Sequence, residues 1–209
     1  MKKMLVVAAL AVVGAFVSCG TTSTPDAGSL DFSTGTKILA HLEGKTMVMQ
    51  GADIPNSPLG FNQNLNFGLN TQCYNKVKID VLGGNFAVTT NVGQFTPGGD
   101  GGVGQVGVCD TSVAVGSPLQ YTSSAVLFQN VTDNGGCFDA DLTYTGFAQE
   151  GRGKISQDGT TVTLELYTSG RATNIRCANG PVGTIGADGG VKVLGSTLLG
   201  NSQQTYRVQ

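Results

Sequence analysis

The chain has 209 residues, 12% of them charged, and a formal net charge of −2. This length favours one domain with short appendages, and without a basic excess a nucleic-acid partner is not expected. Glycine is frequent, at 32 residues, and there is one histidine and no tryptophan. These counts exclude most His-based catalytic designs and favour a secreted or surface β protein over a helical bundle.

The N-terminus has the order of segments found in secretory signal peptides. Lys2 and Lys3 precede an apolar run over residues 5–17, and a charged segment followed by an apolar run of this length is typical of a signal peptide. The run is shorter than the roughly 20 apolar residues that a transmembrane helix needs. We therefore expect residues 1–18 to be a signal peptide that is removed.

The apolar run ends in Phe16-Val17-Ser18-Cys19, which resembles the lipobox of bacterial lipoproteins. Phe16 stands where that family usually has Leu, and Ser18 fits the position before the cysteine. The resemblance implies cleavage before Cys19, a diacylglycerol on its thiol and a further acyl group, such as palmitate, on the new amino terminus. Gly20 replaces the Asp that retains such proteins in the inner membrane. This implies the outer membrane, with the protein in the periplasm or on the surface.

The alternative at the N-terminus is ordinary signal cleavage near Ser18, with Cys19 merely adjacent. In either case residues 19–29 are rich in Thr, Ser and Gly and carry few apolar side chains, so this segment cannot bury enough surface to fold. We expect residues 19–29 to form a lipidated, flexible tether between the membrane and a single β domain, residues 30–209. Two or three acyl chains anchor a protein stably, so the lipid on Cys19 would make the membrane its partner.

Helical periodicity is confined to residues 33–44, where Ser33 or Thr34 can cap the start and Gly44 can end the helix. Strands are expected after it at 46–50 and 65–69. The clearest hairpin spans residues 73–92, where apolar and charged residues alternate on both sides of Gly83-Gly84. Further strands are expected near 104–109 and 124–131, in 137–148, on both sides of Asp158-Gly159, and near 172–177, 190–195 and 204–208.

This pattern gives about nine or ten short strands joined by tight turns, which predicts an all-β antiparallel up-and-down meander. A barrel and a β-sandwich both fit such a meander. The size, the leading helix and the Leu42–Thr46 segment resemble lipocalin-type (calycin) barrels, although Thr46 stands where that family has Trp. The resemblance implies a closed barrel with the N-terminal segment across one end.

Four cysteines remain in the domain: Cys73, Cys109, Cys137 and Cys177. An even number in an oxidising compartment predicts two disulfides rather than a metal site. Strand alternation places Cys137 and Cys177 at the same end of the sheet, which leaves Cys73 for Cys109. Two intervening strands would still hold Cys137 and Cys177 about 14 Å apart in a flat sheet, so the sheet must curl or its ends must bend.

No candidate catalytic or metal centre stands out. His41 lies near the end of the predicted helix and no nucleophile elbow accompanies it, so we interpret it as a helix-surface residue. Asp133, Asp139 and Asp141 could hold calcium, but a solvated strand face is preferred. Ion pairs of small energetic weight are expected among three side chains on neighbouring strands, namely Glu150, Arg152 and Glu165. We therefore expect no enzyme activity, no cofactor and no metal.

Two functions remain open. The first is a membrane-anchored, non-enzymatic module that binds a small apolar ligand in or at the mouth of a β-barrel. The alternative is a structural lipoprotein of the cell envelope that contacts a protein or polysaccharide and has no ligand cavity. The volume and lining of any internal cavity separate the two.

Overall fold

The computed structural model describes residues 30–54, 61–62, 73–96, 106–184, 190–193, 195–197 and 203–209. The expected signal peptide, tether and Cys19 lie outside these residues, as does the strand predicted at 65–69. Within the described part of the chain, no helix combines the length and apolar character needed to cross a membrane.

The described residues are mostly strands, with one α-helix and short 3-10 turns. The bounds are α1 (Gly35–Leu42), β1 (Thr46–Gln50), η1 (Gly51–Asp53), β2 (Phe61–Asn62), β3 (Tyr74–Leu82), β4 (Asn85–Thr96), β5 (Val106–Thr132), η2 (Asp133–Gly135), β6 (Cys137–Tyr144), β7 (Phe147–Ile155), β8 (Thr161–Thr168), β9 (Ala172–Thr173), η3 (Cys177–Asn179), β10 (Lys192–Val193), β11 (Ser196–Thr197) and β12 (Gln204–Val208). The predicted helix and the strand at 46–50 are therefore present.

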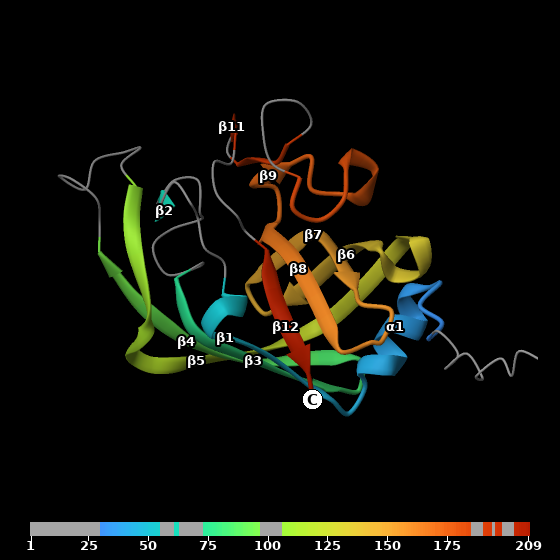
Figure 1. The fold of residues 1–209 in the computed structure, drawn as a ribbon, viewed down its shortest axis with the longest axis horizontal. Helices are drawn as coiled ribbons and strands as arrows, with labels where there is room; N and C mark the ends of the chain where they lie inside the picture. Colours follow the sequence, from blue (N-terminus) through green and yellow to red (C-terminus); the bar gives the residue numbers. More distant parts are fainter. Residues whose placement is uncertain are drawn as a thin grey trace, which may run out of the picture.

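Eight of these strands pair in an antiparallel ring, in the order β1-β3-β4-β5-β6-β7-β8-β12 (Figure 1). The ring is closed by β12, which pairs with β8 on one side and with β1 on the other. Consecutive ring strands are neighbours throughout, so the predicted up-and-down meander is confirmed. The pairing fits the barrel and the sandwich that the sequence left open.

The β3–β4 hairpin forms where the alternating pattern predicted it. Leu82 pairs with Asn85, which leaves Gly83 and Gly84 as a two-residue turn. Both glycines have positive φ, 60° and 72°, and the turns that best match the twist of a hairpin require such angles. Local sequence chemistry is thus sufficient to fix this element.

The helix α1 closes one end of the ring. Thr34 caps it, because its Oγ1 accepts a hydrogen bond from the amide of Lys37 at 3.3 Å. Ile38 and Leu42 are fully buried in the same core as the strand side chains. The approach is so close that a Cβ on Gly35 would collide with the backbone carbonyl of Phe128, so glycine is needed there.

Three turns meet the α1 segment at this closed end. The carboxylate of Glu43 accepts hydrogen bonds from the amides of Gly83 and Gly84 in the β3–β4 turn. In the β5–β6 turn, Asn134 accepts a hydrogen bond from the amide of Phe32 at 2.7 Å. His41 Nε2 lies 3.0 Å from a carbonyl of the β7–β8 turn. The opposite end of the ring, which carries the β6–β7 turn, is called the open end below.

One strand is much longer than the sequence pattern predicted. The strands expected near 104–109 and 124–131 are parts of the single 27-residue strand β5. Its pairing with β4 shifts register twice, and together the two strands reach beyond the rest of the ring (Figure 1). The exposed apolar side chains on this projecting part are Val108, Val113, Val115 and Leu119.

The chain from residue 169 to 184, here called the flap, leaves the ring after β8. The strands predicted near 172–177 and 190–195 do not enter the ring, because β9, β10 and β11 form a separate three-stranded sheet. Ile175 in the flap packs with Val191, Val193 and the outward-facing Tyr167 of β8 in a second small core. The flap therefore covers part of the outer face of the ring.

Candidate functional site

A small cavity lies inside the ring toward its open end. Its volume is about 20 Å³, and its walls combine apolar side chains with the phenols of Tyr74, Tyr121, Tyr144 and Tyr206 and the amides of Gln149 and Gln204. No charged side chain lines it. A space of this size holds about one water molecule.

Hydrogen bonds join most of the polar groups around the cavity. The hydroxyl of Tyr206 donates to Gln204 Oε1 at 2.7 Å, and Tyr74 is also hydrogen-bonded to Gln204. Tyr121 and Thr90 lie 3.4 Å apart through their hydroxyl oxygens. The sheet thus positions these side chains in two hydrogen-bonded groups, one around Gln204 and one between Tyr121 and Thr90.

Burial keeps these tyrosines protonated. Loss of solvation raises the pKa of Tyr74, Tyr121, Tyr144 and Tyr206 above the ordinary tyrosine value. Mutual proximity adds to the effect, since Tyr121 further raises the pKa of Tyr144. The cavity wall is therefore neutral over the whole physiological pH range.

Tyr144 differs from these neighbouring tyrosines. It is only 5% exposed, and within the described residues its hydroxyl has no hydrogen-bond partner. Its ring stacks on Phe147 with centroids 4.5 Å apart and planes 15° apart, and Tyr121 meets both rings edge-on. Phe147 is 40% exposed, so this aromatic cluster runs from the cavity to the surface.

The volume bears on the ligand that the sequence led us to expect. Pockets for small molecules usually measure about 300–1,000 Å³, far more than the roughly 20 Å³ present here. Large side chains occupy the space instead, and Phe86, Phe128 and Phe138 are all buried in the core. An apolar ligand enclosed by the ring stays a prediction, and the filled interior gives it little support.

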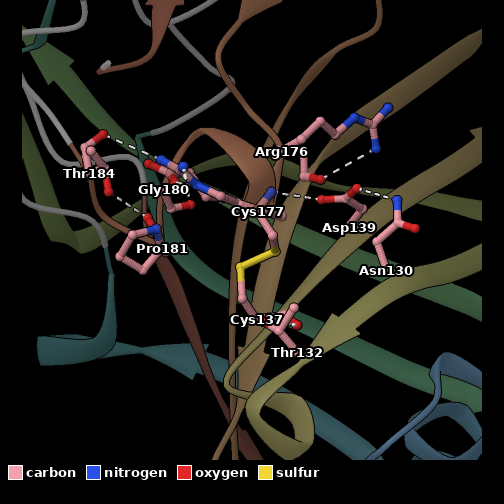
Figure 2. The surroundings of a disulfide bond; sticks show 12 residues. Asn130, Thr132, Cys137, Asp139, Arg176, Cys177, Gly180, Pro181 and Thr184 are labelled. Carbon is pink, nitrogen blue, oxygen red and sulfur yellow. Dashed lines mark hydrogen bonds and ion pairs between the residues drawn. A yellow bond between two sulfur atoms is a disulfide. The ribbon is translucent and has the colours of Figure 1, made fainter. Parts of the chain in front are cut away.

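The structure contains both expected disulfides, Cys73–Cys109 and Cys137–Cys177. Their Cα atoms are 5.5 and 5.9 Å apart. The sheet does curl, but the second bridge does not depend on that curl, because Cys177 lies in the flap and not at the end of a ring strand. Figure 2 shows the flap crossing back to Cys137 at the start of β6.

Acidic side chains on the outer face of β6 and β7 hold the flap. Asp139, 5% exposed, accepts hydrogen bonds from the amide of Cys177 and from Asn130, each at 2.8 Å (Figure 2). Arg176 lies 2.7 Å from Asp141 and 2.9 Å from Glu150. Asp139 is thus not on the solvated strand face that we preferred. Among the described residues, no three acidic, His or Cys side chains are arranged to hold a metal ion.

A second ion pair lies entirely beneath the flap. Arg152 Nε is 2.7 Å from Glu165 Oε2, and both side chains have no exposed surface. Arg152 also donates to the flap carbonyls of Gly180 at 2.6 Å and Thr184 at 3.3 Å. The expected ion pair between Arg152 and Glu165 is present, and it is buried because the flap removes it from water.

His41 is part of the closed end and does not approach the cavity. Besides its contact with the β7–β8 turn, its ring lies edge-on to Phe32 with centroids 5.1 Å apart. This packing leaves His41 only partly exposed, less than the helix-surface residue that we interpreted it to be.

Sequence reasoning missed the aromatic cluster and the burial of the Arg152–Glu165 pair. A signal for this burial was available in β8, where Tyr167 points outward on the same parity as Glu165. An aromatic side chain on the outer face of a strand indicates a covering layer. Comparison with protein-family models, with curated proteins and with solved structures found no match for this chain.

Proposed function

We propose that this chain is a lipid-anchored protein of the bacterial cell envelope, at the outer membrane, whose β domain recognises another envelope component without catalysing a reaction. The lipobox-like segment ending at Cys19 supports the anchor. Two disulfides support an oxidising compartment outside the cytoplasm.

The small volume of the internal cavity favours one of the two functions left open by the sequence. The interior of the ring is filled with side chains, and the cavity in it measures about 20 Å³. An enclosed apolar ligand would need more than ten times that volume. Recognition on the outside of the domain, of a protein or a polysaccharide, therefore has better support.

The variant Cys19→Ala tests the anchor. We expect the variant to leave the washed membrane fraction and to accumulate as free protein in the periplasm or medium, because no acyl chain would hold it. Wild type and the variant Ser23→Ala, which alters the tether and not the lipid site, should both stay with the membrane. Quantitative retention of Cys19→Ala in that fraction would contradict a lipid anchor.

The same anchor-free protein tests recognition. After purification it should sediment with envelope material from which detergent has extracted the membranes, because the β domain and not the lipid makes this contact. Crosslinking would then identify the bound component. If the anchor-free protein binds no envelope component at all, the proposed recognition function is wrong.

A further inference from the structure

We propose that the open end of the ring binds the terminal sugar of a neutral polysaccharide, with one sugar hydroxyl entering the cavity and the sugar ring lying against Phe147. This inference rests on the proposed function, because it names the envelope component that the domain recognises.

The chemistry of the cavity selects an uncharged, hydroxyl-bearing group. Its polar lining consists of phenols, amides and one threonine hydroxyl, with no charge. Phenols and amides both donate and accept hydrogen bonds, as a sugar hydroxyl does. A carboxylate or an ammonium ion would lose its hydration there without gaining an opposite charge.

The hydroxyl of Tyr144 has no hydrogen-bond partner among the described residues. Tyr144 is 5% exposed and lines the cavity, and no described residue bonds to its hydroxyl. A buried polar group without a partner is unfavourable. The roughly 20 Å³ of the cavity admits a group the size of one water molecule or one hydroxyl. An incoming sugar hydroxyl would satisfy Tyr144 and displace such a water.

The aromatic cluster supplies the second half of the site. Phe147 is 40% exposed and is held in place by its stack on Tyr144 at 4.5 Å and by the edge of Tyr121 at 5.7 Å. A fixed aromatic ring beside a polar cavity offers an apolar surface and hydrogen bonds at neighbouring points. The C–H face of a sugar ring together with one of its hydroxyls presents the complementary pair. A lipid tail would use Phe147 but not the polar cavity.

The test uses the full chain, purified in detergent, on an array of immobilised neutral oligosaccharides of glucose, galactose, mannose and N-acetylglucosamine. Matching oligosaccharides of uronic acids serve as the charged comparison. We expect binding to at least one neutral series and none to the uronic acids. Tyr144→Phe, which removes one hydroxyl, should weaken binding about fivefold to tenfold. Phe147→Ala should weaken it at least tenfold.

Leu82→Ala is the matched control, since Leu82 is 62% exposed at the closed end. This variant should bind the neutral oligosaccharides with the affinity of wild type. Thermal unfolding of each variant checks that the fold is kept. The inference is overturned if no neutral series binds, or if both Tyr144→Phe and Phe147→Ala bind as wild type does. Sedimentation with envelope material that is unaffected by either substitution would overturn the sugar site alone and leave the proposed recognition function standing.

Discussion

Arg152 and Glu165 illustrate how position decides the energetic weight of a residue pair. On an open sheet face, an Arg–Glu pair contributes less than about 1 kcal/mol. Here both side chains are fully buried, and flap groups complete their hydrogen bonds, including the amide of Gly183 at 3.2 Å from Glu165. Removing one partner would leave a buried charge without compensation.

We therefore predict that Arg152→Met lowers the free energy of unfolding by about 3–5 kcal/mol. The double variant Arg152→Met with Glu165→Leu should lose less, because it buries no unpaired charge. Arg207→Met is the control: its side chain is 59% exposed in the pair with Asp53, so its loss should stay below about 1 kcal/mol. Urea unfolding measures all three. Equal losses for Arg152→Met and Arg207→Met would show that burial adds nothing.

The cavity tyrosines predict a loss of stability in alkali. Their pKa values are raised above the ordinary value of about 10, so the folded state keeps protons that the unfolded state releases. Their contribution is complete below about pH 10 and is lost as the pH rises above it. The free energy of unfolding should therefore fall steeply above about pH 10.

Near-ultraviolet phenolate absorbance provides the measurement. Tyr74, Tyr144 and Tyr206 should ionise together with unfolding, and Tyr206→Phe should make the fall with pH less steep. If these tyrosines ionise gradually as the pH rises while the protein stays folded, the prediction is contradicted.

At the scale of elements, the Cys137–Cys177 bridge has a local effect that the Cys73–Cys109 bridge lacks. The two bridges close loops of similar length, because their cysteines are 40 and 36 residues apart in sequence. Each bridge is worth about 4 kcal/mol in the chain-entropy model. Only Cys137–Cys177 ties the flap to the ring.

Replacing Cys137 and Cys177 by Ser should lower the free energy of unfolding by about 4 kcal/mol and speed hydrogen exchange at the flap amides of residues 177 and 180. Replacing Cys73 and Cys109 by Ser should cost a similar amount of stability and leave exchange in the flap unchanged. NMR-detected hydrogen exchange in both double variants tests this prediction. If the flap amides exchange equally faster in both variants, the Cys137–Cys177 bridge does not hold the flap locally.

Local signals explain which elements the sequence could predict. The helix has its cap at Thr34, and the β3–β4 hairpin has its Gly83-Gly84 turn, so both follow from neighbouring residues. In β5 the pattern indicated two strands, near 104–109 and 124–131, but register shifts against β4 let one strand continue through Gly116 and Pro118. The flap was taken for ring strands because alternation alone does not say which sheet a strand joins.

The candidate site is harder to predict than the fold for the same reason. Tyr144 and Phe147 are close in sequence, yet Tyr74, Tyr121 and Tyr206 reach the cavity from distant strands. Their meeting depends on the closure of the ring, which no local pattern encodes. The pairing of the cysteines was predicted from strand alternation, although the path of Cys177 through the flap was not.

At the scale of the whole molecule, strand number limits what the ring can enclose. A closed sheet of eight strands leaves room for side chains or for one small ligand. Here the side chains of α1 and four buried phenylalanines take most of that room. This explains why the remaining cavity is small and lies at the end away from α1.

Ring closure also sets a condition on how the chain is made. Because β12 lies between β1 and β8, Met47 at the start of the ring pairs with Val208 at its other end. A chain emerging N-terminus first from a membrane channel can form the β3–β4 and β6–β7 hairpins early, but β1 and β8 keep unpaired edges until residue 208 has crossed. For the exported protein that we propose, completion of the fold would be coupled to the end of export, and a holding chaperone at the channel exit would protect those two edges in the interval.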